Sequence, residues 1–315
     1  MKRPSRHQRQ LRLAVRAGAY AALGAAVATP LLRRRLRIPA PVTAAACYSA
    51  PLALAVLQPR SKKRDVAMFT MQMLAFTVVH ELPYDDPEKL RSRLRTRYPI
   101  VSDRLIGRGQ LPNARLQKLL SRFPRGGPVD KFLAWTHWMW FVEPYLALAL
   151  VLARDNDRFP RAARQMAAVF DLGCATYFAV PTAPPWWSSE QGLTDGEEVR
   201  RLMVDVGKKT WGPAWPKMYE TLGGNPWAAM PSLHFATSVQ AALSLSETGK
   251  VEGALGWTYA LTLGFGLVYL GEHYVTDLLA GGLLVAAVRR GENVAEPLVQ
   301  GFNGALQQLE RVATG

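Results

Sequence analysis

The stretch GALGWTYALTLGFG, at residues 253–266, decides the fold class. It carries no charge, and a small residue recurs every few positions, which allows helices inside a bundle to approach closely. Similar apolar runs alternate with arginine-rich stretches along the chain, which is the pattern of a membrane protein. We therefore predict an all-α fold, a polytopic membrane helical bundle. The expected spans are residues 14–32, 38–58, 66–82, 132–153, 162–182, 230–247, 253–271 and 274–289.

The average composition conceals these two populations of segments. The 315 residues have a net charge of +15 and are 49% hydrophobic, yet the mean hydropathy is only -0.03. Because the arginine clusters lie between apolar runs and not on an independent basic module, we expect membrane lipids as partners and no nucleic acid. Cys47 and Cys174 fall within apolar segments, where we expect buried free thiols. The pattern does not indicate an oligomeric state.

We expect three parts along the chain. Residues 1–60 are a basic tail and membrane helices, residues 61–290 are the core, and residues 291–315 are a C-terminal cytoplasmic tail. The run at 14–32 has features of a secretory signal peptide. A second apolar run follows so closely that we favour an uncleaved helix or an interfacial hairpin.

Two long loops interrupt the core. The loop at 83–131 mixes leucine and isoleucine with many arginines. It is either a basic amphipathic surface on lipid headgroups or a solvated loop with one or two short helices. The loop at 183–229 should lie outside, against the bilayer, because tryptophan prefers the membrane–water interface. Its tryptophans are Trp186, Trp187, Trp211, Trp215 and Trp227.

A histidine and an aspartate begin the last apolar segment, in YLGEHYVTDLLAGG at 269–282. His273 and Asp277 are four residues apart, so the carboxylate can reach back to the imidazole ring on a helix. A carboxylate that accepts from one ring nitrogen fixes the tautomer and makes the other nitrogen more basic. That second nitrogen is a candidate nucleophile.

A second motif, AAMPSLHFATS at 228–238, begins an earlier apolar segment. Pro231 suits the first turn of a helix, where its missing N–H is no loss. The N–H groups near Ser232 and Leu233 would then be free donors at a helix start, which favours phosphate. His234 would lie beside that anion. Another histidine, His137, we interpret as a structural hydrogen-bonding residue of the bundle.

The two motifs together resemble the type 2 phosphatidic acid phosphatase superfamily. PSLH followed about 39 residues later by HYVTD is most similar to the inositol phosphorylceramide synthase-like (inositolphosphotransferase) branch, as a bacterial member. The element YFAVPTAPPWW at 177–187 also resembles that branch. The similarity covers roughly 130–290 and extends weakly into 98–117. It implies a six-helix phosphatase core, to which one or two N-terminal helices are added.

The resemblance also implies a chemistry. An integral membrane enzyme would cleave or transfer a phosphoryl-containing group of a lipid phosphate or lipid-linked substrate through a phosphohistidine intermediate. His273 would attack phosphorus, Asp277 would orient the ring, and His234 would protonate the leaving oxygen and then deprotonate the acceptor. The acceptor is water or an alcohol, such as inositol or another polyol. No metal and no cofactor are implied.

The chain departs from the wider family at its phosphate-binding cations. Leu267 occupies the position of an arginine, and VPTAPPWW lacks the usual basic residues. The cations must come from elsewhere, and we expect Lys208 and Lys209 to supply them. The alternatives are Arg200, Arg201 and the arginines of 91–108.

Counting spans gives an expectation for the orientation. The loop at 183–229 and the turn before His273 fall on the face opposite Arg289 and Arg290, which should be inside. The active site should therefore face the extracytoplasmic side of the cell membrane. The same count leaves the basic runs at 33–37 and 83–131 outside, against the charge rule, where they would hold lipid phosphates.

Two other functions remain open on the sequence alone. A non-enzymatic transporter or scaffold could retain such a fold, although we find no inverted repeat of the kind that transporters contain. A haem protein would place paired histidines in the middle of facing spans. His234 and His273 instead lie at the ends of their segments.

Overall fold

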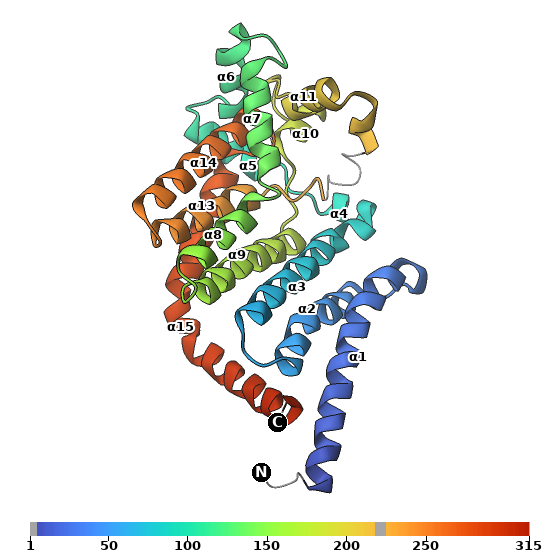
Figure 1. Cartoon of the computed structure of the whole chain (residues 1–315). Coiled ribbons are helices and arrows are strands. Elements are labelled where there is room, and N and C mark those ends of the chain that lie inside the picture. The colour runs from blue at the N-terminus through green and yellow to red at the C-terminus, as the bar shows by residue number, and fades with distance from the viewer. Residues whose placement is uncertain (1–4, 218–224, 315) are drawn as a thin grey trace. The chain divides into compact units, whose positions relative to one another are not determined.

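The computed structural model describes residues 5–217 and 225–314, and within these residues it contains helices and no strand (Figure 1). Two isolated bridges, Arg95 with Thr182 and Thr182 with Ala228, are the only strand-like pairings in this described part. The predicted all-α fold class is confirmed. Residues 218–224 of the expected outer loop lie outside the described residues. The contacts between residues divide the chain into two compact units, residues 1–85 with 290–315 and residues 86–289.

The first unit is a set of antiparallel helices. α1 packs along α2, and α2 along α3, through connections of only a few residues. Ser5 and Ser61 each cap a helix, because their side chains accept a backbone N–H of the first turn. Ala313, in the expected C-terminal tail, is buried against this unit's core, and Glu310 pairs with Arg64 at 3.0 Å. The elements are α1 (Arg6–Leu36), α2 (Ala40–Leu57), α3 (Lys62–Glu81), η1 (Leu82–Asp85) and the last part of α15 (Val275–Thr314).

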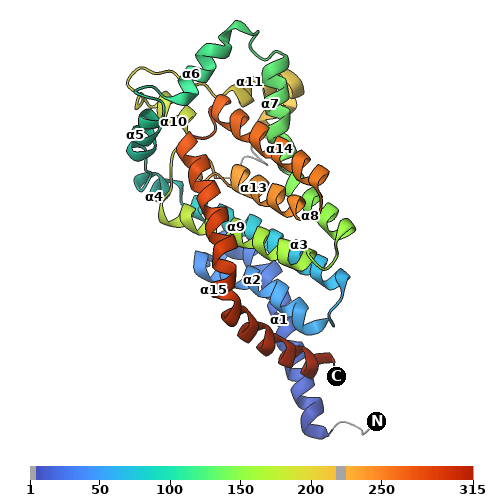
Figure 2. The same cartoon turned by 90° about the vertical axis from the view of Figure 1, so that its left-hand side faces the viewer.

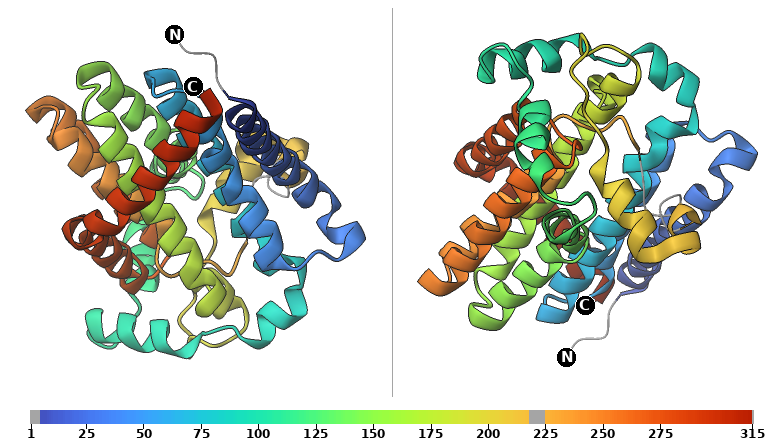
Figure 3. Two further views of the ribbon diagram at one scale, coloured as in Figure 1. Left: turned by 90° about the horizontal axis from the view of Figure 1, so that it is seen from below. Right: turned by 90° about the horizontal axis from the view of Figure 1, so that it is seen from above.

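The second unit surrounds α13, a helix of which most residues are buried. α13 lies beside α14, α8 and α9, and α14 also contacts α7 and α6 (Figures 2 and 3). Gly256 of α14 approaches the backbone of Ala242 closely, since a Cβ at Gly256 would lie 2.8 Å from that residue's Cα. This is the close packing predicted from the small residues.

The helices of the second unit have the following bounds. They are α4 (Pro87–Ser92), α5 (Arg97–Ile106), α6 (Pro112–Leu119), η2 (Leu120–Arg122), α7 (Pro128–Met139), α8 (Glu143–Arg154), α9 (Phe159–Ala179), α10 (Pro185–Glu190), α11 (Leu202–Trp211), η3 (Gly212–Ala214), α13 (Leu233–Ser246), α14 (Lys250–Tyr269) and the first part of α15.

Fewer helices than expected are long and apolar enough to cross a membrane by themselves. In the described part of the chain, α1, α2 and α3 with η1 meet this requirement, and α7 with α8 forms one further candidate that is bent by 59°. The other four expected spans are helical, as α9, α13, α14 and α15, but do not meet it. α13, for example, has 14 residues, whereas a span needs about 20.

The two long loops are more folded than the sequence suggested. The loop at 83–131 contains α4, α5 and α6. Two of its apolar side chains are buried, Leu111 completely and Ile100 almost completely. The short helices agree with the second alternative, although there are more of them than expected and some of their residues are buried. The amphipathic surface on lipid headgroups stays a prediction. In the outer loop, Trp215 and Trp227 are buried in the protein, so the expectation that all five tryptophans lie at the bilayer surface is wrong for these two.

Candidate active site

His273, the nucleophile predicted from the sequence, lies in a tight turn between α14 and α15. Gly271 in this turn has a φ of +82°, and a Cβ there would lie 2.5 Å from the backbone oxygen of Arg200. Only glycine adopts such a conformation at no steric cost. The N–H groups of Glu272 and His273 both donate to the carbonyl oxygen of Leu267, at 3.0 and 3.2 Å. The turn therefore places His273 just before the start of α15.

Two buried residues from the loop at 83–131 fix the start of α15. Asp103 accepts the N–H groups of Val275 and Thr276, at 2.9 and 2.8 Å, and the hydroxyl of Thr276 at 2.6 Å. Burial raises the pKa of the Asp103 carboxyl, although these hydrogen bonds oppose the rise. Asn113 donates from Nδ2 to the carbonyl oxygen of His273 at 2.9 Å. Sequence reasoning did not single out either residue.

The predicted phosphate motif begins α13. Ser232 is the N-cap, and its hydroxyl accepts the N–H of Phe235 at 3.3 Å. The N–H of Ser232 donates to the carbonyl oxygen of Asp277 at 3.0 Å. The expectation of a free donor at Ser232 is therefore wrong, because the start of α13 pairs with the start of α15. A phosphate-binding role for Ser232 and Leu233 stays a prediction.

The three predicted catalytic residues meet where α13 and α15 begin. Nδ1 of His234 lies 3.2 Å from Nε2 of His273, and Nδ1 of His273 lies 3.4 Å from Oδ2 of Asp277. Oδ2 also accepts the N–H of Tyr274 at 2.8 Å. Asp277 is 0% exposed and His273 is 4% exposed. The ring of His273 is thus oriented through one nitrogen and directs the other toward His234, as an oriented nucleophile requires.

One face of α7 holds the ring of His234. His137 and Trp140 are three residues apart, so they lie on the same side of the helix at its C-terminal end. Their rings lie 4.7 and 4.2 Å from the ring of His234, measured between centroids. Trp140 also donates from Nε1 to the hydroxyl of Thr237, one turn along α13, at 2.8 Å. These contacts restrict the orientations that His234 can adopt.

A buried ion pair lies directly beside His273. Arg201 donates to both carboxylate oxygens of Glu272, at 2.8 and 3.0 Å, in the fork geometry that arginine favours. The guanidinium also lies 4.2 Å from the centre of the Trp186 ring. Burial opposes ionisation of Glu272, but the Arg201 guanidinium outweighs it and holds the pKa of that carboxyl below its ordinary value. The site therefore contains a cation held in place.

The two lysines predicted to bind phosphate lie farther along α11. Arg201 is the N-cap of this helix, whereas Lys208 and Lys209 are exposed in its last turn. Seven residues of helix correspond to about 10 Å. Lys209 donates from Nζ to the carbonyl oxygen of Arg125 at 2.6 Å. The structure thus brings Arg201 to the histidines, while the role of the two lysines stays a prediction.

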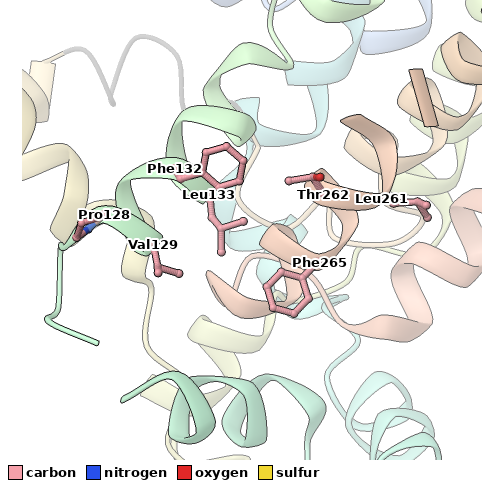
Figure 4. A pocket seen from close by; sticks show the side chains of 7 residues that line it. All are labelled: Pro128, Val129, Phe132, Leu133, Leu261, Thr262 and Phe265. Atoms are coloured by element: carbon pink, nitrogen blue, oxygen red, sulfur yellow. The ribbon is translucent and has the colours of Figure 1, made fainter. Parts of the chain in front are cut away.

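An open apolar pocket of about 660 Å³ lies between α7 and α14 (Figure 4). Its wall residue Leu133 packs against Tyr269 and Leu270, which immediately precede the turn that carries His273. The lining side chains are Pro128, Val129, Phe132, Leu133, Leu261, Thr262 and Phe265. With Phe132 61% and Leu261 60% exposed, apolar side chains line this opening on the surface of α7 and α14.

Comparison with known proteins identifies one family. The model of the PAP2 superfamily matches residues 115–289, more than half of the chain. This range contains both histidine motifs and the whole of α7 to α14. No curated protein and no solved structure matches the chain. In the described residues, no group of three or more histidine, cysteine, aspartate or glutamate side chains could hold a metal ion.

Proposed function

This chain belongs to the PAP2 superfamily, and from that premise we propose that it is a membrane enzyme that transfers the phosphoryl-containing group of a lipid phosphate through a phosphohistidine on His273. The observation that carries the proposal is the line of Asp277, His273 and His234, in which one ring nitrogen of His273 faces a carboxylate and the other faces a second imidazole. Family membership by itself supports phosphatase-type activity on lipid phosphates.

The first step forms the intermediate. With its Nδ1–H donated to Asp277, His273 attacks phosphorus through the lone pair of Nε2, and the bond from phosphorus to the leaving oxygen breaks. His234, protonated at Nδ1, gives its proton to that oxygen. The same proton would bridge the 3.2 Å contact between the two rings before substrate binds. One protonation state therefore suits both the resting contact and the reaction.

Substrate binding must separate the two imidazoles. A nucleophile has to lie about 3–3.5 Å from phosphorus in the attacking geometry. Nε2 of His273 is instead 3.2 Å from a nitrogen of His234, which leaves no room for a phosphoryl group between them. We propose that the ring of His234 turns away when the phosphoryl group enters. In the second step, His234 takes a proton from water or an alcohol, whose oxygen then displaces His273 from phosphorus.

Positive charge for the phosphoryl group comes from two places in this proposal. Arg201 is tied to the site through Glu272, the neighbour of His273, and would shift part of its pairing from Glu272 to the phosphoryl group. Lys208 and Lys209, exposed at the far end of α11, would attract anionic lipid headgroups over a longer distance. The start of α13 adds the partial positive charge of a helix N-terminus, while the main-chain N–H of Leu233 itself is hydrogen-bonded to the phenol oxygen of Tyr177.

A lipid substrate fits the surroundings of the site. Leu133 lines the apolar pocket between α7 and α14. It belongs to the same buried cluster as Tyr269 and Leu270, which directly precede the catalytic turn in the sequence. An acyl chain in this pocket would leave the phosphate free to reach His273. The motif Pro231–His234 reads as in the inositolphosphotransferase-like branch, so we propose an alcohol such as inositol as acceptor beside water.

We further propose that the site faces the extracytoplasmic side. Arg289 contacts Glu247, at the end of α13 opposite the catalytic histidines. Two other arginines, Arg158 and Arg161, also pair with Glu247, and such a cluster suits the cytoplasmic face. Cysteines at Ser189 and Gly291, in a chain without its native cysteines, can be labelled in intact cells with an impermeant thiol reagent. We expect labelling at position 189 only. Labelling only at position 291 would show that the site faces the cytoplasm.

The test of the function is a product assay on the purified protein. A panel of lipid phosphates is offered with and without inositol, and released phosphate and inositol phosphate are measured separately. We expect free phosphate from at least one lipid, and inositol phosphate where inositol is accepted. A well-folded protein that turns over no member of the panel would favour the non-enzymatic alternative, a transporter or scaffold that retains the fold.

A further inference from the structure

His137 is a third imidazole in the site, and one of its nitrogens is left without a partner. Its Nδ1 lies 2.9 Å from the sulfur of Met203. Its Nε2 is buried and has no hydrogen-bond partner among the described residues, while the residue as a whole is 6% exposed. A buried polar atom without a partner is costly, so such atoms are rare and call for an explanation.

His137 lies among the residues of the proposed reaction and not in the apolar core of the bundle. Its ring lies 4.7 Å from that of His234, and it interacts electrostatically with Glu272, His273 and Arg201. Asp130, on the same face of α7, does not satisfy it, because Asp130 accepts the hydroxyl of Tyr269 at 2.6 Å. A purely structural role in the bundle therefore leaves Nε2 unexplained.

We propose that His137 is a substrate-binding residue whose Nε2 contacts an oxygen of the phosphoryl group or of the hydroxyl that leaves or enters. This inference rests on the proposed function and deepens it. Because a thioether sulfur only accepts, the contact with Met203 places the proton on Nδ1, and Nε2 then accepts from a hydroxyl. In the other tautomer, which gives up that weak contact, Nε2 donates to a phosphoryl oxygen. Because α7 also carries Trp140 against His234, one helix end would both hold the acid–base residue and bind its substrate.

The test compares substitutions at His137 with a matched control on the same helix. His137→Phe keeps a ring but removes Nε2, and His137→Gln places an amide nitrogen near the position of Nε2. Thr136→Val is the control, since Thr136 is equally buried and its hydroxyl bonds only within α7, to the carbonyl oxygen of Phe132 at 2.9 Å. Turnover and the unfolding temperature, with and without orthovanadate, are measured for each.

The expected results separate binding from folding. Loss of one hydrogen bond to a charged oxygen should lower kcat/KM of His137→Phe by roughly 10- to 100-fold. Without vanadate its unfolding temperature should equal or exceed that of the wild type, because an unpartnered buried nitrogen is gone. Vanadate should stabilise the wild type and Thr136→Val but not His137→Phe. His137→Gln should recover a large part of both signals.

Three outcomes would overturn this inference and leave the proposed function standing. The first is a His137→Phe protein with wild-type kcat/KM and wild-type stabilisation by vanadate. The second is a lower unfolding temperature with kcat/KM unchanged, which would make His137 structural. If His137→Phe does not fold, His137→Leu takes its place, and the third outcome is a folded His137→Leu protein with wild-type kcat/KM and wild-type stabilisation by vanadate. A wild type that is inactive on every lipid phosphate and insensitive to vanadate overturns the proposed function and this inference together.

Discussion

Asp103→Asn should loosen the catalytic turn without touching either histidine. The carboxylate accepts three hydrogen bonds from the start of α15. The single carbonyl oxygen of asparagine can still accept from both donors of Thr276. Its amide nitrogen would then face the N–H of Val275, so that N–H loses its acceptor. Loss of one hydrogen bond to a charged group costs about 1.5–3 kcal/mol. With an unfolding entropy of about 2.1 cal/mol/K per residue, this corresponds to a decrease of roughly 2–5 °C in unfolding temperature for a chain of 315 residues.

The same change should reduce turnover. His273 lies two residues before Val275, so a loose helix start displaces the nucleophile, and a displacement of about 1 Å can cost roughly 100-fold in rate. Both quantities are measured on detergent-purified protein, by thermal unfolding and by phosphate release. Asp195→Asn is the control, because Asp195 is 77% exposed and makes only a surface ion pair with Arg104. An Asp103→Asn protein as stable and as active as Asp195→Asn would refute the reasoning.

Three further predictions follow from the site. Gly271→Ala should unfold several degrees below the wild type and lose most turnover, because its φ of +82° is unfavourable for alanine and the new Cβ would meet the Arg200 oxygen at 2.5 Å; unchanged stability would contradict the close approach. The pKa of Glu272 is lowered in the folded state, so the stability from its pair with Arg201 should be present at neutral pH and be lost as the pH falls below the ordinary value of 4.5. Glu272→Gln should lack this acid-dependent loss of stability in thermal unfolding scans. If Glu272→Gln and the wild type lose stability identically with falling pH, the ion pair does not contribute in this way. Phosphate release should survive EDTA and be blocked by vanadate, which mimics pentacoordinate phosphorus; a strict magnesium requirement, after controls for substrate micelles, would indicate another chemistry.

The parts of the site that could be predicted are those written in local spacing. His273 and Asp277 are one helical turn apart, so their pairing follows from the period of the helix. Proline followed by serine at 231–232 predicts a helix start close to these residues, and α13 begins at Leu233 with Ser232 as its N-cap. Pro231 therefore lies before the helix and not, as expected, in its first turn. The meeting of the two motifs followed from the family resemblance and not from spacing.

The residues that support the site could not be predicted in the same way. Asp103 lies 172 residues before Val275, and Arg201 lies 71 residues before Glu272. Contacts at such separations depend on how helices pack, which a single sequence does not encode in any local pattern. The Ser232 N–H was assigned as a free donor for the same reason, because its partner on α15 is distant in sequence.

The fold class was predictable for a different reason, and the number of spans was not. Apolar runs with few charges predict helices, and all eight expected segments are helical. Helices packed inside a bundle, such as α13, need fewer apolar residues than a helix that faces lipid, so hydropathy alone separates them poorly from spans. Short helices in the loop at 83–131 were one of the alternatives, but the sequence did not reveal which of their positions are buried, such as Asp103 of α5 and Asn113 of α6.

The most direct test of the phosphohistidine mechanism is the turnover number of His273→Ala on the lipid phosphate that the wild type cleaves fastest. The substitution removes only the imidazole, and Gly271, which shapes the turn, is retained. We expect turnover to fall by several orders of magnitude while thermal unfolding shows a folded protein, since a lost nucleophile leaves little of the chemistry. Wild-type turnover by a well-folded His273→Ala protein would contradict the mechanism.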